Sequence, residues 1–352
     1  MSMFAEVYKV DEHSLSFEIH DGKEMSYEIY MHQNAQICTD SHCLIANGKG
    51  SQTIVSLPSP LLPQYFTLKF ENGETLLCGY RILPLQGMYN FRDMGGYPNK
   101  EGKRVKWGKL YRGDQLYNMD KEAYDAFHAL DIHSIIDFRA YDEYTKNPNT
   151  PAEVYQIRQY HCIPEGKAAA MAGDLATSPS AMHHKYDIDL IKRELQQDPD
   201  LAGKSMIHQQ KEFTRNANSI EAFRDTINLI ADEQNIPVYF HCRGGKDRTG
   251  FAAMLLLALL DVDEEIIMYD YLLTQRAREK KNQAYLEKFR KMANGDEAVA
   301  QVLLSYFDTR KDYLQAAIDE IHQSYSSIQE YAVQKMGIRH ETIQKLKSNF
   351  LE

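Results

Sequence analysis

The stretch His-Cys-Arg-Gly-Gly-Lys-Asp-Arg-Thr-Gly at residues 241–250 is the most informative part of this sequence. A largely apolar run at 237–241 leads into Cys242 and predicts a strand. A second apolar run at 251–260 predicts a buried helix that begins near Thr249. The glycines between the two runs let the backbone approach a ligand closely. Because amides at a helix N-terminus bind anions, the stretch predicts an anion-binding loop.

The side chains of this loop are those that covalent hydrolysis of a phosphate ester requires. Amides and the helix dipole stabilise a thiolate at Cys242, which makes it a candidate nucleophile. Arg248 carries a planar fork that can hold two phosphoryl oxygens. Asp247 is a candidate general acid, and Thr249 is a candidate hydrogen-bond donor to the Cys242 sulfur. The loop residues expected to bind phosphate are Arg243, Gly244, Gly245, Lys246, Thr249 and Gly250.

Other interpretations of the loop are weaker. A cysteine with an arginine six residues later is by itself a weak signal, but none of the other four cysteines has an arginine at that position. A nucleotide-binding loop needs Ser or Thr after its Gly-Lys, and here Asp247 follows Lys246. A sulfur-transfer loop usually has one residue fewer. A merely buried cysteine does not need the neighbouring glycines or Arg248.

The chain is expected to divide near residue 86. Within 1–86, Leu15, Phe17 and Ile19 alternate with polar residues, and Glu-Asn-Gly at 71–73 predicts a hairpin turn. Similar alternation flanks an Asp-Gly turn at 21–22, so this part predicts a small β-sandwich-like domain.

Residues 87–352 predict an α/β domain, a largely parallel sheet flanked by helices. The expected strands cover 133–138, 154–163 and 237–241. A helix before the last strand carries an apolar face made of Ile220, Phe223, Ile227 and Ile230. Asn218, with Glu221 three residues later, is its expected cap. The later part is mostly helical, with a stripe made of Leu314, Ile318, Ile321 and Tyr325, a helix end at Gly337 and a last helix from Thr342.

Residues 165–217 are less regular and form a candidate lid insertion near the loop. An extra pair of surface helices is an equally good interpretation. The adjacent His183 and His184 are expected to be solvated.

Net charge, cysteine content and the lengths of apolar runs argue against several classes of protein. A net charge of −10 argues against general nucleic-acid binding. Five cysteines without regular spacing argue against a disulfide framework and for a reducing compartment. No signal peptide and no apolar run of membrane-spanning length is visible, so we expect a cytoplasmic protein. The spacing of Cys38, His42 and Cys43 fits no common zinc pattern, and we expect neither metal nor cofactor.

Residues 241–250 resemble the signature of atypical bacterial tyrosine phosphatases, a family that includes enzymes active on phosphotyrosine, phosphoserine/threonine and phosphoinositides. Residues 90–97, 108–112 and 137–139, the last with Glu143, are similar to further segments of that family. The similarity covers roughly 87–352 and implies a protein-tyrosine-phosphatase-like fold. It does not cover the β-rich N-terminus.

The resemblance implies a role for several residues. Cys242 is implied as the nucleophile and Arg248 as the phosphate clamp, and Lys246 favours a second negative group. The family is thought to place its general acid inside the loop, which favours Asp247. Asp93 and Asp137 remain rivals for that role, and a structural ion-pair network that includes Arg92 and Arg139 is an equally good interpretation of them.

The sequence therefore predicts hydrolysis of phosphate monoesters through a phosphocysteine, with protein phosphotyrosine as substrate and inorganic phosphate as product. A phosphoinositide phosphatase is the alternative. A non-catalytic module that binds a phosphorylated ligand is a weaker one.

Overall fold

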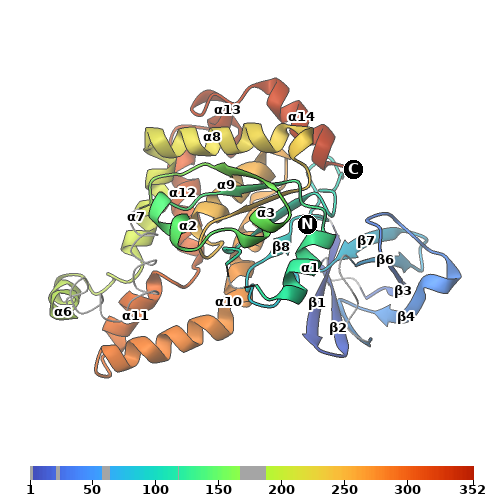
Figure 1. Cartoon of the computed structure of the whole chain (residues 1–352), viewed down its shortest axis with the longest axis horizontal. Helices are drawn as coiled ribbons and strands as arrows, with labels where there is room; N and C mark the ends of the chain where they lie inside the picture. The colour runs from blue at the N-terminus through green and yellow to red at the C-terminus, as the bar shows by residue number, and fades with distance from the viewer. Residues whose placement is uncertain (1–2, 21–23, 58–63, 118, 167–187) are drawn as a thin grey trace.

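The structure is a computed structural model that describes residues 3–20, 24–57, 64–117, 119–166 and 188–352. Figure 1 shows a β-rich N-terminus on one side of the molecule, a central sheet with helices, and a helical pair that projects on the other side. The predicted turn at 21–22 lies outside the described residues.

The N-terminal part consists of two antiparallel sheets. One has the strand order β1-β2-β5 and the other β4-β3-β6-β7. Their bounds are β1 (Phe4–Asp11), β2 (Ser14–His20), β3 (Ser26–His32), β4 (Leu44–Lys49), β5 (Gln52–Ser56), β6 (Tyr65–Phe70) and β7 (Thr75–Gly79), with a 3-10 turn η1 (Ser41–Cys43). Leu15, Phe17 and Ile19 are buried, as their alternation predicts. The predicted hairpin at 71–73 joins β6 to β7, and Gly73 takes the left-handed φ of +86° that favours glycine there.

The second part is built on a five-stranded sheet of order β11-β10-β12-β9-β8. The strands are β8 (Arg92–Asp93), β9 (Leu110–Gly113), β10 (Ser134–Asp137), β11 (Arg158–His161) and β12 (Val238–His241). All neighbours in this sheet are parallel except β8 and β9. The predicted α/β class with a largely parallel sheet is confirmed. The strand predicted at 154–163 is shorter than expected: Val154 ends a helix, and the strand covers only Arg158–His161.

Helices cover the sheet and continue beyond it. They are α1 (Lys121–Ala129), α2 (Tyr141–Lys146), α3 (Thr150–Val154), α6 (Ile188–Gln197), α7 (Lys204–Arg215), α8 (Ala217–Ala231), η2 (Glu233–Asn235), α9 (Asp247–Leu259), α10 (Glu264–Met292), α11 (Glu297–Ser305), α12 (Lys311–His322), α13 (Ile328–Gln334) and α14 (His340–Phe350). The sequence prediction placed the cap of α8 two residues too late. Asn216 accepts from the amide of Ser219, and Asn218 is exposed on the helix.

Helix α9 lies at the centre of this part. It is apolar around its whole circumference, which is the pattern of a helix with no solvent face. Helices α7, α8, α10, α12, α13 and α14 all contact it. It begins at Asp247 rather than near Thr249, so Asp247 and Arg248 lie in its first turn. None of the described helices combines the length and apolar character that crossing a bilayer requires.

The N-terminal sheets pack directly on the α/β part. The Glu6 carboxylate is completely buried, pairs with Arg81 and accepts from the hydroxyl of Tyr269 on α10 at 2.7 Å. Arg276, also on α10, donates to both carboxylate oxygens of Glu18 at 2.7 and 2.8 Å. The division of the chain near residue 86 therefore stays a prediction about organisation, since one apolar cluster spans both sides of it.

The predicted insertion at 165–217 contains two described helices. Helix α7 buries Met206 and Phe213 in the main core. Helix α6 packs with Ile191 against the α10–α11 pair. Residues 167–187, with His183 and His184, lie outside the described residues, so a lid role for this segment stays a prediction.

Candidate active site

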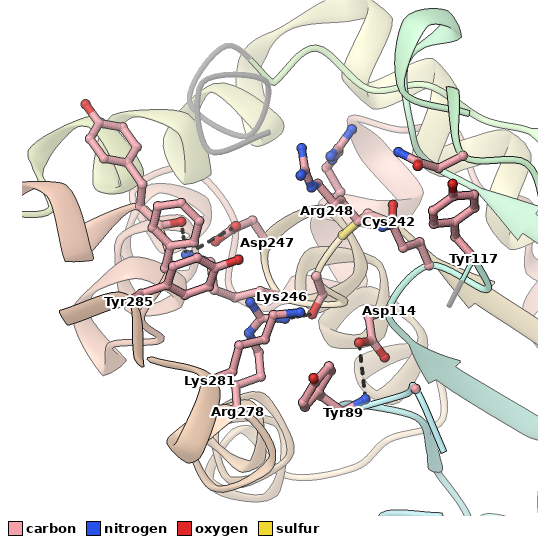
Figure 2. Close-up of a pocket in the computed structure, with 17 residues that line it drawn as sticks. Tyr89, Asp114, Tyr117, Cys242, Lys246, Asp247, Arg248, Arg278, Lys281 and Tyr285 are labelled. Atoms are coloured by element: carbon pink, nitrogen blue, oxygen red, sulfur yellow. Dashed lines mark hydrogen bonds and ion pairs between the residues drawn. The ribbon is translucent and has the colours of Figure 1, made fainter. Parts of the chain in front are cut away.

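The loop between β12 and α9 forms one wall of a cavity of about 310 Å³. Cys242 directly follows β12 and lines this cavity together with Arg243, Gly244, Lys246, Asp247 and Arg248. Figure 2 shows the Cys242 sulfur and the Arg248 guanidinium close together at the cavity. The predicted loop residues are thus gathered around one concave site.

The outward-facing carbonyls of the loop are held by neighbouring side chains. Asn90 donates to the carbonyls of Gly244 and Gly245 at 3.1 and 3.0 Å, and Arg112 donates to Gly245 at 3.0 Å. In a planar trans peptide, a carbonyl and the following amide point in opposite directions. The amides of Gly245 and Lys246 therefore point away from Asn90 and Arg112, neither of which lines the cavity. This arrangement suits an anion-binding nest.

Gly245 is required by both conformation and space. Its φ of +64° lies in the left-handed region, and a Cβ there would lie 2.4 Å from the backbone of Gly113. Gly250 is constrained by space alone, because a Cβ would lie 2.8 Å from the Tyr271 ring. The loop can therefore pack this tightly against β9 and α10 only with glycine at these positions.

Arg248 is held from one side by Glu143 of α2. Its terminal nitrogens donate to the two carboxylate oxygens at 2.7 and 3.1 Å, and one of them also donates to the Phe138 carbonyl at 3.0 Å. Burial opposes ionisation of Glu143, but the Arg248 charge outweighs it and lowers the pKa of Glu143 below its ordinary value. Burial likewise opposes the charge on Arg248, and Glu143 nevertheless raises the pKa of Arg248. The pair stays ionised, and the guanidinium is fixed in orientation.

Asp247 is buried, and one of its two carboxylate oxygens has no hydrogen-bond partner among the described residues. Its Oδ1 is buried and has no hydrogen-bond partner among the described residues, and its Oδ2 lies 3.5 Å from the Lys246 ammonium. Burial raises the pKa of Asp247, although Lys246 and Arg248 act in the opposite direction. A carboxyl group that tends to hold its proton inside the cavity has the property a general acid needs.

The Lys246 ammonium is hydrogen-bonded to neighbouring carbonyl groups. Its ammonium donates to the carbonyls of Tyr306 at 3.0 Å and Asp308 at 2.7 Å, besides its contact with Asp247. The expected role of Lys246 in binding a second anion is therefore shared with a structural role.

The expected hydrogen bond from Thr249 to the Cys242 sulfur does not form. The Thr249 hydroxyl is completely buried and has no hydrogen-bond partner among the described residues. Because Thr249 lies within the first turn of α9, its side chain is oriented by the helix rather than by the loop.

Asp93, Asp137 and Arg139 are buried among structural partners and do not line the cavity. Asp137 is fully buried, pairs with Arg139 at 2.6 Å and accepts from Asn149 at 3.0 Å. Burial opposes ionisation of Asp137, but His241 and Arg139 lower its pKa. Asp93 accepts from the amides of Gly95 and Gly108, both at 2.8 Å, and burial raises its pKa to about 7. None of the three lines the cavity.

Arg92 belongs to a second buried network. It pairs with Asp270 of α10 at 3.0 Å, and Arg112 pairs with the other oxygen of the same carboxylate. Burial opposes ionisation of Asp270, but the two arginines lower its pKa to about 2. This network ties the Asn90 segment and β9 to α10, so it supports the tethers of the loop.

The cavity has walls that sequence reasoning missed. Tyr285, Tyr306 and Phe307 line it from the α10–α11 pair, with 4.4 Å between the ring centres of Tyr285 and Phe307. Arg278 and Lys281 of α10 line it as well. Helical periodicity does place Arg278, Lys281 and Tyr285 on one face, but only the fold shows that this face meets the loop.

The described residues contain no cluster of three or more His, Cys, Asp or Glu side chains arranged to hold a metal ion. The Cys38 and Cys43 sulfurs lie 3.7 Å apart, and neither cysteine lines the cavity.

The chain is similar to known phosphatases over most of its length. A sequence model described as the tyrosine phosphatase family matches residues 83–352. A Cupriavidus necator protein named as a tyrosine-protein phosphatase is 28% identical over 72% of this chain and 83% of its own length. The triple specificity protein phosphatase PtpB of Mycobacterium tuberculosis is 25% identical over 77% of this chain and 99% of its own length.

A solved structure is also similar in part. The catalytic domain of the PP-IP phosphatase SIW14 from S. cerevisiae is 14% identical, covering 64% of this chain and 88% of its own, with a TM-score of 0.28.

Proposed function

The chain belongs to the tyrosine phosphatase family, and on that premise we propose that it hydrolyses protein phosphotyrosine with Cys242 as nucleophile. The observation that carries the proposal is the shared cavity: Cys242 and Arg248 line the same space as the aromatic side chains of Tyr285 and Phe307. An aromatic wall favours an aryl phosphate over the shorter phosphoserine.

The first chemical step proceeds from the anion-binding loop. The Cys242 thiolate attacks phosphorus, the bond from phosphorus to the tyrosine oxygen breaks, and Asp247 donates its proton to that oxygen. Arg248 and the loop amides hold the non-bridging oxygens as charge develops on them. The products of this step are tyrosine and a phosphocysteine.

The second step regenerates the enzyme. A water molecule attacks the phosphocysteine, Asp247 takes a proton from that water, and inorganic phosphate leaves with the thiolate restored. No step draws on a cofactor. Asp247 is the acid in this mechanism because it lies in the cavity, whereas Asp93 and Asp137 are turned to structural partners.

A chromogenic aryl phosphate assay tests the catalytic claim. We expect turnover by the unmodified chain in the presence of a chelator, and none by Cys242→Ser, which still binds vanadate. Cys38→Ser, which changes a cysteine outside the cavity, serves as the matched control and keeps its activity. Turnover by Cys242→Ser at the unmodified rate contradicts the mechanism. Vanadate binding by the unmodified chain without turnover favours a binding module instead.

A substrate panel tests the specificity claim. We expect kcat/KM for a phosphotyrosine peptide to exceed that of the matching phosphoserine peptide. We also expect Tyr285→Ala to reduce this preference, because it removes part of the aromatic wall. Equal rates for both peptides contradict a tyrosine preference and leave the phosphatase assignment intact.

A phosphoinositide remains the second candidate substrate. The observation in its favour is the pair of cationic side chains, Arg278 and Lys281, in the same cavity.

A further inference from the structure

Helix α10 presents two cationic side chains to the cavity. Arg278 and Lys281 are three residues apart, so they lie on one face of the helix. Figure 2 shows them side by side, pointing from α10 toward the cavity. Among the described residues, no ion pair joins a carboxylate to either one, although the charge of Arg278 acts on Asp114 and Asp247 in the same cavity. The two charges are therefore not neutralised by a direct ion pair.

Arg278 is the more buried of the two, at 6% exposure. One terminal nitrogen makes a long contact of 3.5 Å with the Gly244 carbonyl, and its Nε is buried without a hydrogen-bond partner among the described residues. A buried guanidinium Nε–H without an acceptor is costly unless a ligand satisfies it. An anion bound in the cavity, which Arg278 lines, would supply such an acceptor.

Lys281 is held in place without a strong partner. Its ammonium lies 4.2 Å from the centre of the Tyr89 ring. Burial lowers the pKa of Lys281 to about 8, with a further contribution from Arg278 and from Arg243 of the loop, while Asp114 acts in the opposite direction. Asp114 is itself engaged, because its oxygens accept from the amides of Tyr89 and Asn90 at 3.2 and 3.1 Å.

Two other cations of the cavity have direct partners. Arg248 pairs with Glu143, and Lys246 donates to the carbonyls of Tyr306 and Asp308. Arg278 and Lys281, by contrast, have no ion-pair partner among the described residues, so they are available to a second anion in the cavity.

We propose that Arg278 and Lys281 form a second anion subsite that binds a further phosphate group of the substrate while the loop holds the phosphate to be cleaved. This proposal rests on the phosphatase chemistry of the proposed function and not on its preference for phosphotyrosine, because the first phosphate must occupy the loop. The substrate class it indicates is a compact ring, a cyclitol or sugar, that carries two phosphates. Two clustered cations match a phosphate dianion better than a single carboxylate, and a subsite inside the cavity suits a small molecule better than a flanking peptide side chain.

The test compares myo-inositol bisphosphate with myo-inositol monophosphate as substrates. The quantity measured is the ratio of the two kcat/KM values, bisphosphate over monophosphate. We expect Lys281→Met to lower this ratio about ten-fold or more, because it removes one charged hydrogen bond to the second phosphate. Lys280→Met removes the same charge from an exposed position of the same helix, and its ratio stays at the unmodified value.

The pH dependence provides a second, independent readout. Lys281 loses its proton as the pH rises through about 8, so the ratio for the unmodified chain falls across that range. Lys281→Arg stays protonated there, and we expect it to keep the ratio at high pH. A purely structural role of Lys281 would not produce this difference between lysine and arginine.

The same headgroup is then offered free in solution and as a lipid in phosphatidylcholine vesicles. A Lys281-dependent preference for the free compound supports the subsite with a soluble substrate, and a preference only in vesicles supports it with a lipid.

Equal ratios for Lys281→Met and Lys280→Met overturn the subsite. So does a Lys281 dependence confined to peptides with acidic residues beside the phosphotyrosine. If the unmodified chain cleaves aryl phosphate but does not prefer the bisphosphate, only this inference fails; if it cleaves neither, the proposed function fails.

Discussion

The Arg248 guanidinium donates to both carboxylate oxygens of Glu143, at 2.7 and 3.1 Å, across the gap between α9 and α2. Glu143 is fixed in turn by the amide of Ala140, which donates to it at 2.9 Å. The Arg248 Nε is buried without a hydrogen-bond partner among the described residues. Glu143 therefore orients the arginine while leaving Nε for the phosphate.

Glu143→Gln tests this relationship. The amide side chain keeps the shape but removes the negative charge and one acceptor, so Arg248 loses its fixed orientation. We expect kcat/KM for an aryl phosphate to fall by about 10- to 100-fold, corresponding to roughly 1.5–3 kcal/mol for a charged hydrogen bond. Glu153→Gln, an exposed change on α3, is the matched control. Equal kinetics for the two variants would falsify the orienting role.

Asp247→Asn tests the general acid. Because the pKa of Asp247 is raised by burial, its protonated form persists to higher pH than that of an ordinary aspartate, and the rate falls as the pH rises through that pKa. We expect the variant to lack this alkaline limb. We also expect a larger loss with phosphotyrosine than with an aryl phosphate whose leaving group needs no proton. A pH profile that keeps the limb in Asp247→Asn assigns the acid to another residue.

Gly245→Ala tests the packing of the loop. Gly73→Ala is a useful comparison, because both glycines have left-handed φ but a Cβ added at Gly73 would have no neighbouring atom within 4 Å. Strain alone costs about 1–2 kcal/mol at such a residue. We expect Gly73→Ala to lose only this strain energy in stability. We expect Gly245→Ala to lose more stability and all turnover, since its Cβ would lie 2.4 Å from Gly113. Thermal unfolding measures the stability of the two variants, and equal losses of stability contradict the steric clash at Gly245.

Asn90→Ala tests the tethers behind the loop. The substitution removes the donors to the Gly244 and Gly245 carbonyls, so the amides of the loop lose their fixed direction. We expect vanadate inhibition to weaken by about ten-fold, which is in the range for loss of a buried hydrogen-bonded group. Asn218→Ala on the exposed side of α8 is the control. Unchanged inhibition in Asn90→Ala, with the fold intact by circular dichroism, shows that the loop holds its shape without Asn90.

Local patterns were sufficient for the parts of the site that are close in sequence. The strand, the glycines and the apolar helix around Cys242 predict a loop of this kind because each of them constrains its neighbours directly. Boundaries were less predictable. Asn216 rather than Asn218 caps α8, and α9 begins at Asp247, because two candidate residues compete at each helix end and packing selects between them.

The roles of side chains that are far from the loop in sequence could not be predicted. Glu143 stood out only as part of a similar segment, and Arg278 and Lys281 not at all. A charged residue on an amphipathic helix is usually solvated, and no local pattern tells which helical face will meet a loop elsewhere in the chain. Asp93 and Asp137 show the reverse case, since acidic residues at strand ends are turned to buried amides and arginines.

Residues 241–250 were enough to predict the anion-binding loop, since Cys242, its glycines and Arg248 are close neighbours and their geometry follows from a strand running into a helix. The surroundings of that loop depend on the three-dimensional packing. The approach of α2 pairs Arg248 with Glu143, and the passage of α10 brings Arg278 and Lys281 to the cavity. This difference arises because backbone geometry is set by neighbours along the chain, whereas the charge and shape of a cavity are set by which distant surfaces pack against it.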